Sequence, residues 1–371
     1  MRQCFSIGLF ALLVLSLPGC GGFRDTKPQL PGNLDTLCMP DYASGFEMYR
    51  YDSSTLLRIV NPWQGADSVS QWVFLSRDDE KPPKGFAGET IDVPVRRIVC
   101  MSSSYVAFLE ALGADSTICA ISGTGYIWSD KVRNRIARGE IAEAGFDNSL
   151  NFEKLVALKP DVVFLYGLTG KNAVTDKLHE LGLKTVYIGD YVENNPLGRA
   201  EWITVFGEFT GRRELASTLF DSISNEYNRA KALVSGVEKR PEVMLNAPWQ
   251  DSWFVPGDRS YMVRLLEDAG GNYACRGVDS DQSRPISTET AFVAASQSDF
   301  WLSPGTVTSL AELNAMNPRF GSIPPVRNGN VYNNNARTTP EGGSDFWESG
   351  VLRPDRVLAD LVHIFHPELS E

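Results

Sequence analysis

The chain has 371 residues, of which 46 are acidic and 35 are lysine or arginine, and its formal net charge is −11 at pH 7. Such a negative chain argues against nucleic acid and anionic lipid head groups as partners, because both are themselves negatively charged. A chain of this length is too long for one hydrophobic core and suits two α/β lobes.

The first twenty residues have the pattern of a secretory signal that ends in a lipidation site. Arg2 precedes an apolar stretch of roughly 11 residues, which is too short to span a bilayer and typical of a signal peptide. The stretch ends in Leu17-Pro18-Gly19-Cys20, which resembles a bacterial lipobox. The resemblance implies removal of residues 1–19, attachment of a lipid to Cys20, and a periplasmic lipoprotein anchored to a membrane. The alternative is an ordinary secretory signal in which Cys20 is incidental.

Residues 20–95 are expected to contain the lipidated cysteine, a tether and a small β extension. Residues 21–35 are rich in Gly, Pro, Asp and Lys, which is typical of a flexible linker. Within residues 45–77 the runs FEMYRY, TLLRIV and SQWVFL have strand character and are separated by turn residues. They predict an antiparallel addition to the first lobe.

From Arg96 onward, short β-branched runs alternate with helical patterns, which predicts βαβ units and a mostly parallel sheet. A helix from about 213 to 234 interrupts this alternation and, at 1.5 Å per residue, is roughly 33 Å long, enough to bridge two lobes. The alternation then restarts. The sequence therefore predicts an α/β fold with two Rossmann-like lobes, residues 96–212 and 238–371, joined by a single long α-helix over 213–237.

Two segments of the chain share one pattern. NFEKLVALKPDVVFL at 151–165 and STETAFVAASQSDFWL at 287–302 each contain a helical run, then an Asp, then a strand-like run. Each glutamate, Glu153 and Glu289, follows a good N-cap by two places, so it lies in a first helical turn, where the helix dipole stabilises a carboxylate. A duplicated unit with one acidic residue per lobe predicts symmetric docking onto a two-subunit partner.

Catalytic and metal-binding motifs are missing from the sequence. The three histidines, His179, His363 and His366, do not stand beside a candidate nucleophile, and G-x-S-x-G, CxxC, HExxH and EF-hand spacings are absent. So few histidines also argue against a bare zinc or manganese site. We therefore predict a binding protein rather than an enzyme, with no catalytic residue, no resident metal and no cofactor.

Four cysteines remain beyond the lipobox, and the sequence leaves their pairing open. Two of them fall in neighbouring predicted strands, where buried thiols are favoured over a disulfide bond. These two are Cys100 and Cys119, and the others are Cys38 and Cys275.

The loops expected at the ligand-binding edge of the sheets are unusually aromatic. In open α/β sheets, ligands bind beyond the carboxyl ends of the strands. Rigid rings line clefts for large, partly apolar ligands at low entropic cost, although each ring alone fits core packing equally well. Arg337 and Lys171 are the cations best placed to meet an anionic ligand, with a solvated or structural role as the alternative. The aromatic candidates are Tyr105, Tyr126, Trp128, Tyr166, Trp249, Trp253 and Trp347.

From about Arg96 to the C-terminus, the chain resembles the iron–siderophore, haem and vitamin B12 class of ABC-importer substrate-binding proteins. RRIVCMSSSYVAFLEALGA looks like that family's first strand and helix, and NFEKLVALKPDVVFL is the most specific matching segment. The resemblance implies two lobes joined by a rigid helix, with a ligand cleft between them. It also implies a monomeric receptor that delivers its ligand to a permease dimer with ATPase subunits.

The same resemblance assigns roles to individual residues. It implies that Glu153 and Glu289 pair with arginines of the permease. Where the B12 binders place a cleft tryptophan, this chain has the stretch DQSRP with Arg284, which favours an iron complex of siderophore type over cobalamin. A corrinoid or haem receptor is the alternative, and an enzyme that removes metal from a chelate is the rival outside the binding class. The cleft aromatics that carry over are Tyr166 and, less closely, Tyr126, Phe146 and Trp249.

Overall fold

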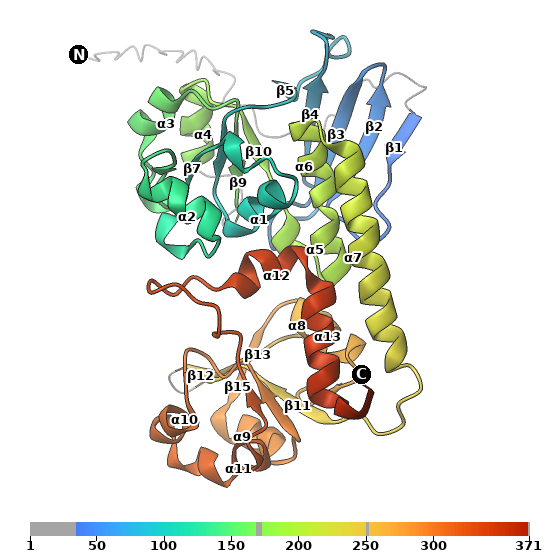
Figure 1. The fold of residues 1–371 in the computed structure, drawn as a ribbon, viewed down its shortest axis with the longest axis vertical. Helices are drawn as coiled ribbons and strands as arrows, with labels where there is room; N and C mark the ends of the chain where they lie inside the picture. The colour runs from blue at the N-terminus through green and yellow to red at the C-terminus, as the bar shows by residue number, and fades with distance from the viewer. Residues whose placement is uncertain (1–34, 168–172, 250–251, 370–371) are drawn as a thin grey trace, which may run out of the picture.

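The computed structural model describes residues 35–167, 173–249 and 252–369, so the predicted signal peptide, Cys20 and Lys171 lie outside its description. The described residues form two lobes that lie one above the other and are joined along one side by a long helix (Figure 1). Each lobe contains a parallel sheet with helices around it, and a β extension lies against the first lobe. This arrangement confirms the predicted fold class. Among the described helices, none combines the length and apolar character needed to cross a bilayer.

In the described part of the chain, the first lobe is built on a parallel sheet with the strand order β10-β9-β6-β7-β8. The strands β6, β7 and β9 are buried along their whole length, as a parallel sheet covered on both faces requires. The strands are β6 (Ile98–Cys100), β7 (Ile118–Ile121), β8 (Ala142–Glu143), β9 (Val162–Leu165) and β10 (Thr185–Tyr187). The helices are α1 (Ser103–Ala111), α2 (Asp130–Ala137), α3 (Phe152–Leu158), α4 (Ala173–Glu180), α5 (Pro196–Glu201) and α6 (Ile203–Thr210).

The second lobe has a parallel sheet with the order β14-β11-β16-β17 and a small antiparallel sheet with the order β12-β13-β15. The antiparallel sheet is not apparent from the sequence pattern. The strands are β11 (Glu242–Leu245), β12 (Pro248–Trp249), β13 (Ser252–Val255), β14 (Asn272–Tyr273), β15 (Arg284–Ser287), β16 (Phe300–Leu302) and β17 (Val331–Tyr332). The helices are α8 (Tyr261–Asp268), α9 (Thr288–Ser296), α10 (Leu310–Met316), α11 (Pro324–Asn328), α12 (Ser349–Leu352) and α13 (Pro354–Phe365).

The duplicated sequence pattern corresponds to a duplicated structural unit. Helix α3 leads into β9, which pairs with β6, and helix α9 leads into β16, which pairs with β11. The aspartate at the end of each pattern holds the start of the neighbouring strand. Asp161 accepts hydrogen bonds from the N–H groups of Arg96 (2.6 Å) and Arg97 (2.9 Å), and Asp299 accepts one from Glu242 (2.9 Å).

The β extension is a sheet with the order β1-β2-β3-β4-β5, antiparallel except for the parallel pair β4 and β5. Its central strands are almost entirely buried, because the sheet packs on the first lobe and contributes to the same hydrophobic core. The predicted antiparallel addition is therefore confirmed. The strands are β1 (Asp35–Cys38), β2 (Phe46–Tyr51), β3 (Ser54–Val60), β4 (Ser70–Ser76) and β5 (Glu89–Asp92).

Two buried carboxylates of the first lobe fasten this extension. Glu201 accepts hydrogen bonds of 2.7 to 2.9 Å from the backbone N–H groups of residues 41–43. Glu193 accepts bonds of 2.8 to 3.0 Å from the N–H groups of Ser44 and Gly45. Five successive backbone donors are thus held by two carboxylates, and charge-assisted bonds of this kind are stronger than neutral ones.

Helix α7 (Arg213–Leu233) is attached to both lobes. At its start Arg213 forms an ion pair with the buried Glu208 of the first lobe. Near its end the Tyr227 hydroxyl donates to Asp268 of the second lobe (2.8 Å), and Lys231 pairs with the same carboxylate (2.8 Å). These contacts at both ends make the helix a rigid spacer.

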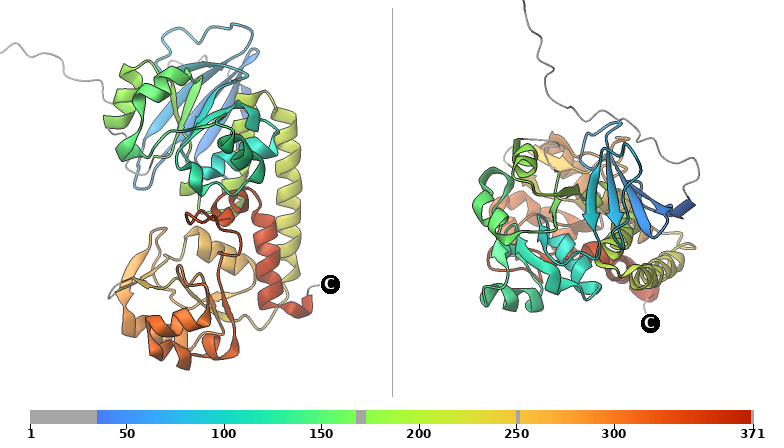
Figure 2. Two further views of the ribbon diagram at one scale, coloured as in Figure 1. Left: turned by 60° about the vertical axis from the view of Figure 1, so that its left-hand side comes forward. Right: turned by 90° about the horizontal axis from the view of Figure 1, so that it is seen from above.

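After β17 the chain returns toward the first lobe before it forms α13. Residues 335–348 form a crossing hairpin with an antiparallel bridge between Thr338 and Ser344, and α12 then packs against α1 and α5 (Figures 1 and 2). Gly343 lies so close to Tyr126 that an added Cβ would be 2.0 Å from the Tyr126 carbonyl oxygen, so only glycine fits there. The predicted second-lobe range 238–371 therefore includes a segment that packs on the first lobe.

Candidate functional site

Two adjoining cavities lie between the lobes, with volumes of about 420 and 320 Å³. They share three lining residues, so we treat them as one interlobe cleft. The shared residues are Tyr191, Arg199 and Trp347. The others include Ser102, Ser103, Ser104, Tyr166 and Asp190 from the first lobe, Gln64 from the extension, and Asn246, Pro256, Tyr261, Met262, Asp281 and Val351 from the second-lobe sequence.

The first-lobe wall of the cleft is built from loops that follow three parallel strands. Residues 102–104 follow β6, Tyr166 follows β9, and Asp190 and Tyr191 follow β10. Because the carboxyl ends of parallel strands meet at one edge of the sheet, these loops converge on one cavity. The rings of Tyr166 and Tyr191 lie 4.3 Å apart between centroids.

The N-terminus of α1 opens into this cavity. Its N-cap, Ser102, places its hydroxyl against the Ser104 hydroxyl (3.0 Å) rather than on a helix N–H group. The first turn contains no acidic residue. The positive end of the helix dipole thus faces the cavity, while the serine hydroxyls are engaged with one another, with the Trp347 carbonyl and with Asp190.

Asp190 lies at the base of the same wall and is almost completely buried. One of its carboxylate oxygens, Oδ1, has no hydrogen-bond partner among the described residues. Burial raises the pKa of Asp190 to about 6, although the Ser104 hydroxyl and the nearby Arg199 guanidinium favour its charged form.

Arg199 connects the two walls of the cleft. Its Nε donates to the carbonyl of Glu193 (2.9 Å), and one terminal nitrogen donates to the carbonyl of Tyr191 (2.8 Å). The guanidinium group also lies over the Tyr261 ring of the second lobe, 4.0 Å from its centroid. Two carbonyls and one aromatic face therefore fix this cation in the cleft.

The second-lobe sequence supplies both apolar and polar groups, with Asn246, Ser260, Asp281 and Ser283 beside the rings and aliphatic side chains. Tyr261 is buried, and burial raises the pKa of its hydroxyl, so the ring is neutral at physiological pH. Trp347 packs against Tyr261 with centroids 6.4 Å apart and is 44% exposed toward the cleft region. The Ser103 hydroxyl donates to the Trp347 carbonyl (3.4 Å), which joins α1 to the crossing hairpin.

The β extension also reaches the cleft, through the loop between β3 and β4. The backbone N–H of Gln64 donates to the Tyr191 hydroxyl (3.3 Å), which in turn donates to the Gly167 carbonyl (3.1 Å). Trp63 packs edge-on against Tyr187, with ring centroids 5.1 Å apart. The extension is thus part of the site.

Several predicted ligand residues lie near one another. Tyr166 and Trp347 line the cleft directly. Tyr126 and Phe146 form an exposed edge-to-face pair with centroids 6.2 Å apart. The Arg337 guanidinium lies 5.8 Å from the Trp128 ring centroid and forms a 2.8 Å ion pair with Asp345. The structure thus brings Trp128 and Arg337 together at the crossing hairpin, beside the cleft rather than among its lining residues. Neither they nor the Tyr126–Phe146 pair contributes to the lining of the two described cavities.

Three other predicted ligand residues lie elsewhere. Tyr105 is fully buried, and its hydroxyl donates to the carbonyls of Leu165 and Ile188, so its ring fills the first-lobe core. Trp253 is also fully buried and donates to the Leu245 carbonyl, so it fills the second-lobe core. Trp249 is 71% exposed on β12 and does not line either cavity as described.

Glu153 and Glu289 lie on α3 and α9, on the outer parts of the two lobes (Figure 1). Both side chains are exposed. The predicted N-caps are present: Asn151 accepts from the Lys154 N–H (3.0 Å), and Ser287 accepts from the Thr290 N–H (3.1 Å). The two glutamates therefore lie in equivalent first helical turns, away from the cleft.

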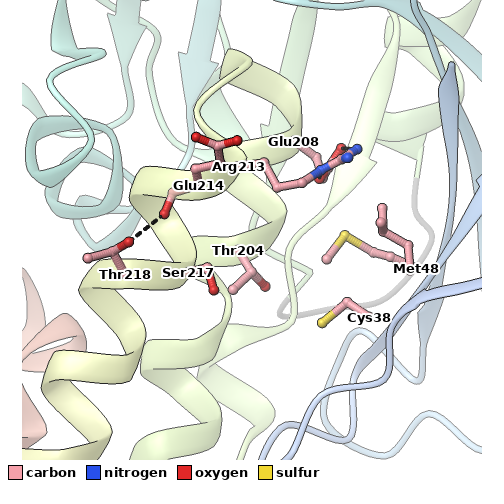
Figure 3. A pocket seen from close by; sticks show the side chains of 9 residues that line it. Cys38, Met48, Thr204, Glu208, Arg213, Glu214, Ser217 and Thr218 are labelled. Atoms are coloured by element: carbon pink, nitrogen blue, oxygen red, sulfur yellow. Dashed lines mark hydrogen bonds and ion pairs between the residues drawn. The ribbon is translucent and has the colours of Figure 1, made fainter.

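A further cavity of about 460 Å³ lies between the β extension and helices α6 and α7 (Figure 3). Its walls come from a single side of the molecule rather than from both lobes. Its buried carboxylate, Glu208, already binds Arg213 and the Thr55 hydroxyl. Burial raises the pKa of the Cys38 thiol to about 11, which makes it unreactive at neutral pH. This cavity is therefore a less suitable ligand site than the interlobe cleft.

The cysteines and carboxylates do not form a metal centre in the described part of the chain, where clusters of three or more potential ligands are absent. Cys100 and Cys119 are free buried thiols in the adjacent strands β6 and β7, as favoured from the sequence. Cys38 and Cys275 are free as well.

The Periplasmic binding protein family model matches residues 98–338, and the chain belongs to this family. An uncharacterized lipoprotein of Methanocaldococcus jannaschii is 27% identical, with 99% of this chain and 94% of that protein covered. A second uncharacterized lipoprotein of that organism is 25% identical, over 93% and 86% of the two chains. The family match confirms the resemblance found in the sequence.

Solved structures with the same fold include a possible iron-binding protein from Staphylococcus epidermidis (TM-score 0.56, 19% identity, 73% of this chain and 98% of that one). A periplasmic haem-binding protein from Pseudomonas aeruginosa is similar (TM-score 0.55, 19% identity, 74% and 93%). So is the periplasmic vitamin B12-binding protein of Vibrio cholerae (TM-score 0.52, 12% identity, 73% and 98%).

Proposed function

We propose that this chain is the substrate-binding lipoprotein of an ABC importer, which captures a metal chelate in the interlobe cleft and delivers it to a membrane permease. The cleft itself is the observation that carries the proposal. Its cavities are of the size typical for small-molecule sites, roughly 300 to 1,000 Å³, and four rings, those of Tyr166, Tyr191, Tyr261 and Trp347, line it.

An iron complex of siderophore type is the primary candidate ligand, with a corrinoid or haem as alternatives. Proteins of this fold are named for binding iron, haem and vitamin B12. The neutral tyrosine rings and the single fixed guanidinium of Arg199 suit a large chelate with both apolar and polar surface.

Delivery would use the outer faces of the two lobes. Glu153 and Glu289 are exposed, equivalent in position, and placed on separate lobes at a spacing set by α7. A permease dimer with one arginine cluster per subunit would receive one glutamate from each lobe. We further propose that Cys20 carries the lipid anchor and that the protein works as a monomer in the periplasm.

Ligand binding can be tested with the purified full-length protein. A ferric siderophore, cyanocobalamin and hemin would each be titrated while tryptophan fluorescence is recorded, alongside visible spectra and native mass spectrometry of any co-purified ligand. We expect at least one chelate to bind with micromolar or tighter affinity. Tyr166→Ala combined with Trp347→Ala should weaken it at least tenfold, because both rings line the cleft.

The matched control is Tyr332→Ala, an exposed aromatic residue on β17 outside the cleft, which should leave the affinity unchanged. Failure of all three chelates to bind would refute the proposed function. Equal losses in the cleft variant and the control would refute the cleft as the site.

A further inference from the structure

The loop between β3 and β4, residues 61–69, lies over two strand ends of the first lobe. Gly167 and Gly189 closely follow the parallel strands β9 and β10. An added Cβ at Gly167 would be 3.4 Å from the Trp63 Cβ atom. An added Cβ at Gly189 would be 3.3 Å from the Pro62 Cα atom. The loop therefore rests on the edge of the sheet beyond which ligands bind in open α/β folds.

Hydrogen bonds close this loop and attach it to the first lobe. The Asn61 side chain accepts from the Val69 N–H (3.0 Å), and the Asn61 N–H donates to the Val69 carbonyl (2.8 Å). The adjoining strand β4 is joined to β10 through Gln71, whose amide donates to the Thr185 carbonyl (2.9 Å) and accepts from the Tyr187 N–H (2.9 Å). Because these bonds and the shared hydrophobic core hold the extension, the loop is a fixed wall.

The tip of the loop forms part of the cleft. Gln64 lines the cavity of about 320 Å³, which Asp281 of the second-lobe sequence also lines. The backbone N–H of Gln64 donates to the Tyr191 hydroxyl (3.3 Å), and Tyr191 lines both cavities of the cleft. A ligand that fills the cleft therefore meets the loop at this end.

A fixed loop at this place limits the size of the ligand. The cavities of the cleft, about 420 and 320 Å³, are each near the lower end of the roughly 300 to 1,000 Å³ that is typical of small-molecule sites. Pro62 and Trp63 occupy the space beyond β9 and β10 into which a larger ligand would extend. Since the family model matches residues 98–338, this loop lies outside the matched part of the chain.

We propose that the β3–β4 loop sets the upper size of the ligand. With Pro62, Trp63 and Gln64 in place, the cleft admits a compact chelate and excludes one as bulky as a corrinoid. This inference rests on the proposed function, because it concerns the ligand of the same cleft. It assigns to the β extension a role in ligand selection, in addition to its contribution to the hydrophobic core.

The test compares ferrichrome, hemin and cyanocobalamin, of which cyanocobalamin is the bulkiest, by isothermal titration of the full-length protein. The wild type should bind ferrichrome or hemin at least tenfold more tightly than cyanocobalamin. In the main variant an Asn-Gly turn replaces residues 61–69. Val60 and Ser70 are paired across the hairpin, and a two-residue turn can join such a pair.

The shortened loop should change the affinities in opposite directions. Cyanocobalamin should bind at least tenfold more tightly than to the wild type, because the space beyond β9 and β10 is open. The probe that the wild type prefers should bind about tenfold more weakly, because the Tyr191 hydroxyl loses the Gln64 N–H. Equal losses for all probes would show that the loop supplies contacts but no size limit, and would overturn the proposal.

A second variant enlarges the loop instead of removing it. Gln64→Trp adds a ring at the cavity wall and should weaken the preferred probe at least tenfold. The matched control is Lys84→Trp, at an exposed position between β4 and β5 outside the lining residues as described, and it should leave all affinities unchanged. Thermal unfolding would verify that each variant is folded, and Gln64→Trp decides the question if the shortened hairpin does not fold.

The outcomes separate the size limit from the proposed function. The size limit is overturned, while the proposed function stands, if the wild type prefers cyanocobalamin or if the folded shortened variant binds cyanocobalamin no more tightly than the wild type does. Unchanged or higher affinity of Gln64→Trp for the preferred probe would also overturn it. If none of the three probes binds to the wild type, the proposed function fails and the size limit fails with it.

Discussion

The two lobes are alike on their outward faces and unlike on the faces that meet at the cleft. Outside, α3 and α9 start with equivalent caps and glutamates, and Asp161 and Asp299 hold equivalent neighbouring strands. Inside, the first-lobe wall carries the buried Asp190 and the fixed cation Arg199, whereas the opposite wall contributes the Tyr261 and Trp347 rings, aliphatic side chains and a different set of polar groups, without a cation among its lining residues as described. A duplicated exterior suits a symmetric partner, and an asymmetric interior suits recognition of the ligand chiefly by one lobe.

The largest expected effect concerns the symmetric exterior. Replacing Glu153 and Glu289 together by Ala should abolish ligand uptake in cells and leave ligand affinity unchanged, because both side chains are exposed and lie away from the cleft. Each single variant should retain partial uptake. The control replaces the exposed Glu180 and Glu238 by Ala and should transport normally. Normal uptake by the Glu153/Glu289 double variant would contradict the docking role.

The β extension distinguishes the first lobe from the second. Mutation of Glu201 tests how strongly the extension is held to the first lobe. Glu201→Ala should lower the free energy of unfolding by about 3 kcal/mol, because it leaves three backbone N–H groups of residues 41–43 without their acceptor. Urea denaturation measures this loss. The exposed Glu238→Ala should change stability by less than about 0.5 kcal/mol. Similar small losses in both variants would show that the Glu201 hydrogen bonds contribute little to holding the extension.

Mutation of Arg199 tests whether the first-lobe wall of the cleft dominates recognition of the ligand. Arg199→Lys should weaken the bound chelate about tenfold, because lysine cannot bond two carbonyls and stack on Tyr261 at once. Arg264→Lys is the control, since Arg264 is a half-exposed arginine of α8 on the second-lobe side. Isothermal titration with the chelate that binds to the wild type gives both affinities. A larger effect of the control would reverse the proposed asymmetry.

The stability of the protein should depend on pH through two buried acids. Burial raises the pKa of Asp190 to about 6 and that of Glu348 to about 7. Glu348 accepts from the N–H groups of Trp128 (2.7 Å) and Ser129 (2.9 Å), with Asp345 and Glu110 adding negative charge nearby. Between the ordinary and the raised values the folded state binds protons that the unfolded state has released. Stability should therefore fall as pH rises from about 4 to 7.

The expected difference in unfolding free energy between pH 5 and pH 7.5 is about 1–3 kcal/mol in favour of pH 5, after allowance for other groups that titrate in this range. Thermal and urea unfolding at both pH values measure it. Asp190→Asn and Glu348→Gln should each reduce the difference. A protein that becomes steadily more stable toward pH 7.5 would contradict this prediction.

The sequence predicted the repeated architecture well, because its evidence is local. N-caps, strand runs and helical periodicity depend on residues close in the chain, so α3, α9 and the parallel strands follow from pattern alone. The same local reasoning also indicated Tyr166, which directly follows a predicted strand.

The cleft was predicted less well, because burial is decided by tertiary packing. Tyr105 and Trp253 have the expected position along the chain, yet their rings point into the lobe cores. Asp190 and Tyr191 follow β10, so the rule that ligands bind beyond strand ends also applies to them. The sequence does not indicate that Asp190 is buried, because an aspartate in a loop is usually exposed. Gln64 and Tyr261 carry no sequence signal, because the extension and α8 reach the cleft only after folding.

The smallest expected effect tests whether the extension takes part in ligand recognition. Gln64 lines the cleft, and its backbone N–H supports the Tyr191 hydroxyl. Gln64→Ala removes the side chain but keeps that backbone bond, so affinity should fall only about threefold, whereas Gln64→Pro removes the donor and should cost about tenfold. Gln297→Ala, at an exposed position at the end of α9, should leave the affinity unchanged. If the proline variant binds the chelate as tightly as the wild type, the extension supports the first lobe without contributing to recognition, and the asymmetry of the cleft belongs to the lobes alone.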